Sequence, residues 1–500
     1  MSTKKHNGFA SSLGFVLASA GSAVGLGNIW GFPYKTGRFG GAAFVIVYVI
    51  MALLIGIVGM VAEMYVGKRA QANPVSALKK INPKLGFVGL ISVVVPFFII
   101  CYYSVLGGYT LRGVIASFSD IGKSATEVGD GLGSFMASPW LSVLCTFIFL
   151  GLAVVVIIGG VQKGIEKASK VLMPVLFIIL LGVMIYCLCL GEGVKDGLDF
   201  YILKADFKAL IENGGIAAAM GQVFFSMSLG MGIMISYGSY TGKEINLFKS
   251  AVQVSIIDTA IALMAGFAIF PAAYHFMAVE GVKVELKGFG LMFETLPLVF
   301  NSLGAIGGII GAFFFLMVAI AAITSVVSLV EVVTQFFIQK FKIDRKRAAI
   351  FPMILIMIIS VFVSLSLGGH FKVFGFDLLT FFDEITNTVL MPVCALAVCL
   401  AAGYGIKQRE FAENIVPDKP FFGNLVSVMI RFVTPVLIIA VLASGVINGL
   451  ENEDYPMYYT VLLFAALLAG VTALVYFLSG LHRKNTGCNA DELASIADGD

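Results

Sequence analysis

Six side chains whose oxygen atoms could bind a hard cation lie inside strongly apolar stretches of the sequence. Carboxylate, carboxamide and hydroxyl oxygens suit a hard cation better than a soft transition metal. Asp258 is the most informative, because an isolated carboxylate in the run VSIIDTAIALMAGF would cost roughly 2.5 to 3.5 kcal/mol inside a membrane. We therefore expect Asp258 either to bind a cation or to be a protonated or hydrogen-bonded structural acid. The six residues are Asn28, Ser226, Ser228, Asp258, Thr324 and Ser325.

Other polar residues in apolar stretches have structural explanations. For Glu63, in MVAEMYVG, and Glu331, in SLVEVVTQ, we favour a structural role over a direct functional one. Hydroxyls such as those of Thr324 and Ser325, in AAITSVV, commonly bond back to their own helix. Tyr103, in IICYYSV, fits a packed or interfacial aromatic equally well. Residue type alone does not separate these alternatives, so the elements that carry the residues have to be considered.

The composition places these residues in a membrane protein. Of 500 residues, 59% are hydrophobic and 13% are charged, which is far from the balance of a soluble domain. Apolar stretches of about 20 residues, enough to span the ~30 Å hydrocarbon core, recur along nearly the whole chain. The net charge of +3 does not indicate nucleic-acid binding. The four histidines and seven cysteines are not spaced as a metal site or a disulfide framework.

The apolar stretches predict an all-α membrane protein with twelve transmembrane helices. Residues 1–9 form an N-terminal segment, 10–404 a core of ten helices, 405–480 the last two helices, and 481–500 a polar, acidic tail to which we assign no function. The predicted spans are 10–35, 41–67, 85–118, 140–158, 168–190, 213–240, 248–275, 305–337, 347–366, 374–404, 424–448 and 456–480.

Basic residues gather in alternate loops and orient the helices. Lys68 and Arg69, Lys163, and the segment Arg345 to Arg347 fall on one side with the N-terminal lysines. The opposite loops carry acids such as Asp120. Because basic loops stay in the cytoplasm, both termini of this multi-pass protein are predicted to be cytoplasmic.

Two predicted spans are interrupted by glycines and small polar residues. Ala20 to Asn28 reads AGSAVGLGN in the first span, and Phe225 to Gly232 reads FSMSLGMG in the sixth. An unwound backbone at membrane depth is tolerated only where it lines a cavity or binds a ligand. Its carbonyls suit a cation, and its helix N-termini suit an anion. Breaks five spans apart also indicate a five-plus-five inverted repeat. The alternative is that these glycines only permit close helix packing.

These motifs resemble those of the bacterial neurotransmitter:sodium symporter family. The resemblance rests on AGSAVGLGNIWGFP at Ala20 to Pro33, and it extends from about Gly8 to the twelfth span. GGAAF at Gly40 to Phe44, KGIEKASKVLMP at Lys163 to Pro174, and GQVFFSMSLGMG at Gly221 to Gly232 support it. The family's fold implies an inverted repeat with discontinuous helices 1 and 6, and its members are transporters rather than enzymes.

The resemblance implies two sodium sites and a substrate pocket. The first site would use Ala23, Asn28, Ser226 and Asp258 with the substrate carboxylate, and the second would use Gly21, Val24, Ala321, Thr324 and Ser325. The carboxylate would meet Leu26, Gly27 and Tyr103, and the ammonium would meet the carbonyls of Ala23, Phe225 and Ser226. The side-chain pocket would be lined by Ile99, Phe225, Ser228, Met231, Ser325 and Leu329.

Three positions refine the expected substrate and ions. Monoamine-transporting relatives carry Asp at the position of Gly25, so glycine here favours a substrate with its own carboxylate. Met231 stands where some relatives have Phe, and its flexible side chain favours a hydrophobic or aromatic L-amino acid. Asp258 brings a fixed negative charge near the first sodium site, which predicts chloride-independent transport.

The sequence departs from the family at both gates. Gly31 stands where many relatives have an Arg that pairs with an acid in the tenth span, here Asp383. The partner of Asp383 is then missing or supplied by Lys35 or Arg38. At the other face Gln339 stands where some members have an acid, so the sequence does not identify the gate pair at either end. Tyr103 and Phe225 are expected to close over the substrate.

The sequence therefore predicts a sodium-coupled amino-acid importer of the plasma membrane that works by alternating access. Its expected partners are the amino acid, sodium ions and the bilayer, with no nucleic acid and no obligate protein partner. Two alternatives remain open: a transporter of another carboxylate-bearing solute such as betaine, and a nutrient sensor that binds without transporting.

Overall fold

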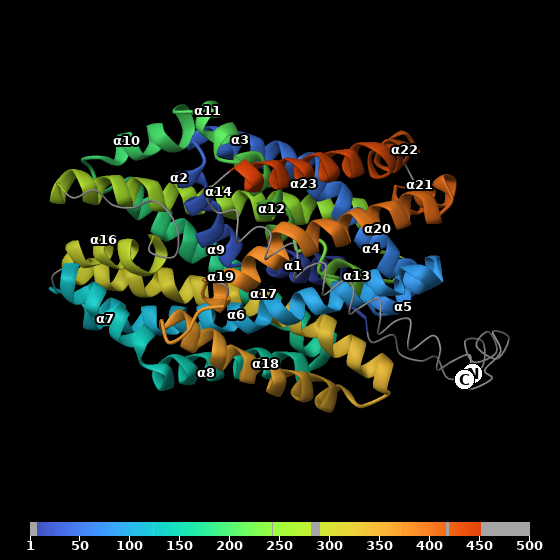
Figure 1. Ribbon diagram of the computed structural model, residues 1–500, viewed down its shortest axis with the longest axis horizontal. Helices are drawn as coiled ribbons and strands as arrows, with labels where there is room; N and C mark the ends of the chain where they lie inside the picture. The colour runs from blue at the N-terminus through green and yellow to red at the C-terminus, as the bar shows by residue number, and fades with distance from the viewer. Residues whose placement is uncertain are drawn as a thin grey trace.

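The chain folds into an elongated bundle of helices that lie side by side (Figure 1). The computed structural model describes residues 8–123, 125–242, 244–281, 291–373, 375–416 and 420–451. In these residues every element longer than an isolated bridge is a helix, so the predicted all-α class is confirmed.

The helices of the described residues match the predicted spans. Nine segments are long and apolar enough to cross a membrane, and a tenth is the pair Ser12–Ala23 and Gly27–Arg38, bent by 49°. With the interrupted sixth span they cover the first eleven predicted spans. The twelfth, 456–480, and the tail, 481–500, lie outside the described residues. The nine are Ala42–Ala70, Pro83–Ser119, Trp140–Ile158, Val161–Leu188, Leu247–Glu280, Gly304–Phe341, Arg345–Leu367, Leu378–Gly405 and Phe421–Ala440.

Short π-helical turns divide several spans into the labelled elements. The α-helices are α1 (Ser12–Ala23), α2 (Phe32–Arg38), α3 (Ala42–Met51), α4 (Ile57–Ala70), α5 (Pro74–Ile81), α6 (Gly86–Ser119), α7 (Ala125–Ala137), α8 (Pro139–Ile158), α9 (Lys167–Leu188), α10 (Val194–Leu198), α11 (Phe207–Glu212), α12 (Gly215–Ser226), α13 (Ile233–Ser239), α14 (Leu247–Glu280), α16 (Leu296–Ser302), α17 (Gly304–Phe341), α18 (Arg345–Leu367), α19 (Leu378–Glu384), α20 (Met391–Gly405), α21 (Gln408–Ile415), α22 (Pro420–Val428) and α23 (Thr434–Glu451). The π-helical turns are η1 (Gly27–Gly31), η2 (Ala52–Gly56), η4 (Val161–Glu166), η5 (Asp199–Leu203), η6 (Leu291–Thr295), η7 (Ile385–Leu390) and η8 (Met429–Val433), and η3 (Pro83–Leu85) is a 3-10 turn.

Both predicted breaks are present, and each is shorter than its motif. The first span leaves the helix at Val24, whose backbone is extended, and becomes helical again at Gly27. The sixth span is irregular between α12 and α13, where Gly230 and Gly232 have φ of +77° and +69°. Glycine reaches such angles without a Cβ clash. Ser228, with φ of +56°, is a non-glycine residue held in the same region by the surrounding contacts.

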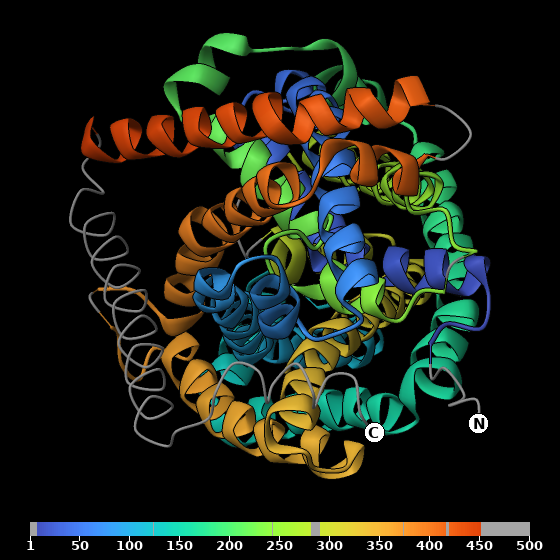
Figure 2. The same ribbon diagram turned by 90° about the vertical axis from the view of Figure 1, so that its right-hand side faces the viewer.

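The breaks lie in the interior, about half-way along the bundle. In Figure 1 α2 and α12 extend from the breaks toward one end, while α1 and α13 extend toward the other. We call the end that α2 and α12 approach the Lys35 end, and it includes α7 and α10. We call the opposite end the Arg345 end, and it includes α5. The view in Figure 2 looks along the bundle from the Arg345 end. The helix α1 contacts α9, α14 and α17, so the first broken span faces three other spans.

Candidate substrate and cation site

A buried polar cluster joins the first break to α12 and α14. The Nδ2 atom of Asn28 donates to Oδ1 of Asp258 at 2.7 Å and to Oγ of Ser226 at 3.0 Å. The Ser226 hydroxyl in turn lies 2.8 and 2.9 Å from the two carboxylate oxygens of Asp258. All three residues are fully buried. The intramembrane carboxylate thus has the partners that the sequence analysis required.

The same cluster contains a residue that the sequence analysis missed. The hydroxyl of Tyr48, on α3, lies 3.3 Å from both Ser226 Oγ and Asp258 Oδ2. Tyr48 is fully buried against Phe32. Its only sequence signal is a polar tip within the apolar run AAFVIVYVIM, which many packed tyrosines share.

A second oxygen-rich cluster joins α1 to α17. The Ser325 hydroxyl lies 3.1 Å from the backbone carbonyls of Ser22 and Val24. Thr324 bonds back to the carbonyl of Ala321, on its own helix, at 3.0 Å. A Cβ at Gly21 would lie 3.4 Å from Cβ of Thr324, which is ordinary van der Waals contact, so α1 and α17 lie against each other here. Residues predicted for the second cation site therefore lie at a contact between these helices, and the Ser22 carbonyl, which the sequence analysis did not name, accepts a hydrogen bond there.

A small cavity of about 20 Å³ lies between the two clusters. It holds about one water molecule, so a larger ligand would require the walls to move apart. The cavity brings together most of the predicted substrate residues, and Ser22 and Ile233 are additions. Leu26 and Ser226 do not line it. Its lining is Ser22, Ala23, Gly25, Gly27, Ile99, Tyr103, Phe225, Ser228, Met231, Ile233, Ser325 and Leu329.

Tyr103 and Phe225 lie next to each other in the lining of the cavity. The amide of Leu26 donates to the hydroxyl of Tyr103 at 2.7 Å, which pins this side chain against the break. The ring of Phe225 lies 6.3 Å from the ring of Tyr103, centroid to centroid. At Gly25 a Cβ would collide with the hydroxyls of Tyr103 and Ser325, so this wall of the cavity is bare backbone.

Comparisons with known proteins identify the family. The sequence model of the sodium:neurotransmitter symporter family matches residues 6–128 and 122–483. Over 451 residues the chain is 34% identical to an uncharacterized sodium-dependent transporter, YhdH, of Bacillus subtilis (strain 168), covering 88% of this chain and 98% of that protein. An uncharacterized sodium-dependent transporter of Methanocaldococcus jannaschii is 30% identical over 490 residues, covering 95% and 97%. The crystal structure of MhsT in complex with L-phenylalanine matches with a TM-score of 0.81 and 37% identity, covering 87% of this chain and 99% of that one.

The chain belongs to the sodium:neurotransmitter symporter family. It is accordingly an integral membrane protein and a sodium-dependent transporter, and not an enzyme. The resemblance noted in the sequence is confirmed, as is the fold with its discontinuous first and sixth helices.

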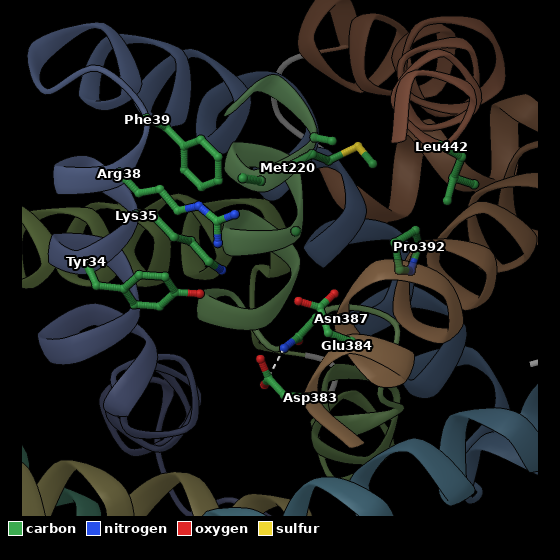
Figure 3. Close-up of a pocket in the computed structure, with 13 residues that line it drawn as sticks. Tyr34, Lys35, Arg38, Phe39, Met220, Asp383, Glu384, Asn387, Pro392 and Leu442 are labelled. Carbon is green, nitrogen blue, oxygen red and sulfur yellow. Dashed lines mark hydrogen bonds between the residues drawn. The ribbon is translucent and has the colours of Figure 1, made fainter. Parts of the chain in front are cut away.

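At the Lys35 end of the symporter a larger cavity of about 190 Å³ is lined by residues that include Lys35, Arg38 and Asp383 (Figure 3). Asp383, on α19, accepts hydrogen bonds from the hydroxyl of Tyr102 at 2.8 Å and from Asn387 at 2.6 Å. Lys35 donates to Gln222 instead, at 2.9 Å. The ion pairs of the described residues include none to Asp383.

At the Arg345 end the buried carboxylate of Glu331 forms an ion pair with Arg345. The hydroxyl of Tyr240 also donates to Glu331, at 2.7 Å. These contacts join α17 to α18 and to the residue that follows α13. The sequence analysis expected a structural role for Glu331 but did not identify these partners. Gln339 accepts hydrogen bonds from the backbone and side-chain amides of Asn73 rather than from a cation.

Proposed function

We propose that this symporter imports a hydrophobic or aromatic L-amino acid together with sodium across the plasma membrane. The proposal rests on two features that lie next to each other at the first break, a small cavity lined by glycines and a buried carboxylate. Gly25 and Gly27 line the small cavity, and the next residue, Asn28, bonds to the buried carboxylate of Asp258. A zwitterion in the cavity would therefore place its carboxylate beside a cation held by Asp258.

The buried cluster of Asn28, Ser226 and Asp258 is the proposed first sodium site. Asn28, Ser226 and Asp258 supply oxygen atoms, and the carbonyl of Ala23 and the substrate carboxylate complete the set. In the structure the amide nitrogen of Asn28 donates to the carboxylate of Asp258. Sodium needs an acceptor oxygen in place of that N–H group, so we propose that the Asn28 amide turns over when the ion binds. Substrate and ion are then coupled directly.

The contact between α1 and α17 is the proposed second sodium site. Its ligands would be the carbonyls of Gly21, Val24 and Ala321 and the hydroxyls of Thr324 and Ser325. In the structure the Ser325 hydroxyl donates to Val24 and Ser22. A cation coordinated by those carbonyls and by the hydroxyls of α17 would link the two helices more strongly than the Ser325 hydrogen bonds do. Sodium would thereby hold the two helices together, which biases the protein toward the state that binds sodium best.

The pocket chemistry supports an apolar amino acid. Ile99, Met231, Ile233 and Leu329 give the cavity an aliphatic lining, and methionine adapts to large apolar groups. The backbone amides at Leu26 and Gly27 and the hydroxyl of Tyr103 would receive the carboxylate. The solved relative MhsT, 37% identical, was crystallised with L-phenylalanine.

The proposed mechanism is alternating access with the Lys35 end outside and both termini in the cytoplasm. Tyr103 and Phe225 close over the bound solute, and the bundle then opens at the Arg345 end. Each sodium ion that moves inward gains about 2.3 kcal/mol per 100 mV of membrane potential. Chloride is not required, because Asp258 already supplies a negative charge at the first sodium site.

The test is uptake of a radiolabelled amino-acid panel into proteoliposomes with an inward sodium gradient. We expect accumulation of leucine, phenylalanine, tyrosine or tryptophan well above alanine and glycine, with choline in place of sodium abolishing it. Asp258→Asn should reduce uptake at least tenfold. Asp377→Asn is the matched control, because Asp377 caps α19 outside the site and asparagine caps a helix equally well.

The other outcomes have defined meanings. Preferred uptake of alanine, glycine or betaine would overturn the substrate class. Loss of uptake when gluconate replaces chloride would overturn chloride independence. Sodium-dependent binding without accumulation would identify a sensor rather than a symporter.

A further inference from the structure

Arg431 is a charged residue inside an apolar span. It lies on η8, within the membrane-spanning segment Phe421–Ala440, and its side chain is partly exposed. Phe432, Val436 and Ile439 are 57%, 63% and 53% exposed, and their spacing of four and three residues places them on one face. An exposed apolar stripe thus runs from Arg431 along α23. An arginine at such a place is costly unless it reaches the headgroup region or a partner.

Two hydrogen bonds hold the guanidinium of Arg431 at the end of α20. Its Nε donates to the carbonyl of Gly403 at 2.6 Å, and Nη1 donates to Oε1 of Gln408 at 2.8 Å. Gly403 lies in the last turn of α20, and Gln408 is the first residue of α21. Figure 1 shows α20, α21 and α22 together at the right, at the Arg345 end. The guanidinium is therefore held where α20 leaves the hydrocarbon core and the polar headgroups begin.

An exposed tyrosine lies on the same surface. Tyr404 follows Gly403 on α20, is 59% exposed, and donates from its hydroxyl to the backbone carbonyl of Arg431 at 3.1 Å. The guanidinium carbon of Arg431 lies 6.0 Å from the centroid of the Tyr404 ring. The ring of Phe432 lies 6.4 Å from the same ring. Exposed tyrosines are typical of the membrane–water interface, which agrees with the level of the guanidinium.

The guanidinium of Arg431 has donors that the protein leaves unused. It carries five N–H groups in a planar fork. In the part of the chain that the structure describes, two of them have acceptors, the carbonyl of Gly403 and the side chain of Gln408. None of the ion pairs among the described residues includes Arg431. The side chain is thus fixed in place while its charge is not neutralised.

The acids of α21 are already paired with other arginines. Glu410 forms an ion pair with Arg69 at 2.8 Å. Glu413, about one turn further along α21, forms an ion pair with Arg409 at 2.7 Å. Lys407, which precedes α21, is exposed and takes part in none of the ion pairs of the described residues. This corner of the Arg345 end therefore carries two positive charges without acidic partners.

We propose that Tyr404, Lys407, Gln408 and Arg431 form a site for the phosphate headgroup of an anionic phospholipid. Guanidinium groups bind phosphate oxygens through parallel N–H groups, and Arg431 has such groups to spare. The acyl chains would follow the exposed apolar stripe that begins at Phe432. A soluble phosphate has no chain to place there, so we assign the site to a lipid. The site does not depend on which solute the symporter carries.

The leaflet concerned is the one at the Arg345 end. In the proposed orientation this leaflet is cytoplasmic, where anionic lipids attract basic groups close to the membrane. The lipid would join α20 to η8 through the same guanidinium that already bonds to both α20 and α21.

The experiment measures lipid preference at the site itself. Phe432→Trp places a fluorescent reporter beside Arg431, and Trp140→Phe removes an exposed tryptophan. Trp30 is the other tryptophan of the chain, and its background is measured in Trp140→Phe alone. The purified full chain is reconstituted into mixtures of phosphatidylcholine and phosphatidylglycerol in which one of the two lipids is brominated. Quenching of the reporter then gives the ratio of the two binding constants.

We expect the reporter protein to prefer phosphatidylglycerol about fivefold, the effect of one cation near the surface. Arg431→Gln should lower the preference to less than about 1.5-fold, whereas Arg431→Lys, which keeps the charge, should retain at least about twofold. Arg409→Gln is the matched control. It removes the same charge from the same corner, where Arg409 pairs with the exposed Glu413, and should leave the preference unchanged.

The remaining measurements separate the alternatives. Quenching by brominated phosphatidylcholine does not need the guanidinium, so it shows in each variant that the reporter still faces lipid. No preference in the reporter protein, the same preference after Arg431→Gln, or an equal loss in Arg409→Gln would overturn the proposal. Inorganic phosphate, exchanged for sodium chloride at equal ionic strength, should leave the preference unchanged. If it abolishes the preference, the site binds soluble phosphate and the lipid assignment is wrong.

Discussion

At the scale of the residue, a glycine shapes the cavity as much as the larger side chains do. Gly25 leaves backbone facing the cavity because a Cβ would meet the hydroxyls of Tyr103 and Ser325. Both hydroxyls are already engaged, Tyr103 with the Leu26 amide and Ser325 with the Val24 carbonyl. A larger residue at position 25 would therefore disturb the proposed substrate and cation sites together.

Gly25→Ala should weaken substrate binding without unfolding the protein. Forcing an extra methyl into a packed site costs about 1 to 3 kcal/mol, which is a weakening of roughly five- to 150-fold. The measurement is the concentration of the preferred amino acid that gives half-maximal uptake. Gly182→Ala is the control, because a Cβ at Gly182 meets no atom within 4 Å. An unchanged half-saturation in Gly25→Ala would refute the steric argument.

At the scale of the element, the break in the sixth span depends on one buried acid. Glu63, on α4, accepts the backbone N–H of Gly230 at 2.7 Å, where the irregular backbone has no helical acceptor. The residue is almost fully buried. The sequence analysis favoured a structural role for Glu63, and this contact supplies one. The irregular backbone of the break therefore has a hydrogen-bond acceptor, Glu63, on a neighbouring helix.

Glu63→Leu should lower stability far more than Glu63→Gln. Leucine leaves the Gly230 amide without an acceptor, which costs about 1 to 3 kcal/mol, whereas glutamine retains an oxygen in that place. Thermal melting of the detergent-solubilised protein, followed by size-exclusion chromatography, measures the difference. Equal melting temperatures for the two variants would show that the Gly230 bond contributes nothing to stability.

At the scale of the whole molecule, apolar side chains cover the outside and polar groups lie along the centre. Val155, Ile178 and Phe351 are 70%, 67% and 66% exposed on α8, α9 and α18, as expected of surfaces that contact lipid. The two ends differ in the polar groups that they bury. The Lys35 end retains a cavity, whereas the Arg345 end is joined by the buried Glu331 ion pair.

Arg345→Ala should destabilise the closed Arg345 end. It leaves the buried carboxylate of Glu331 without its cation, a loss that typically costs about 3 to 5 kcal/mol. Thermal melting is again the measurement, and adding Glu331→Gln should restore part of the loss. Arg347→Ala breaks only the exposed pair with Asp344 and should have little effect. If both arginine variants melt alike, the buried pair does not hold this end.

The sequence by itself determined the spans, their order and the positions of the two breaks. The length of the apolar runs matches the thickness of the bilayer, and clustered glycines such as Gly230 indicate a backbone that leaves the helical conformation. The motif around Asn28 was specific enough to indicate the family. These signals are local, so they can be read without knowing what lies opposite.

Only the tertiary structure decided which partner each polar group has. Tyr48 reaches Asp258 from α3, Gln222 connects Lys35 to Gly27, and Arg345 pairs with Glu331. The sequence analysis did not single out Tyr48 or Gln222, because a contact between distant spans leaves no periodic trace in the sequence. Helix packing sets these distances, and a polar group buried among helices bonds to whichever partner the packing brings within reach.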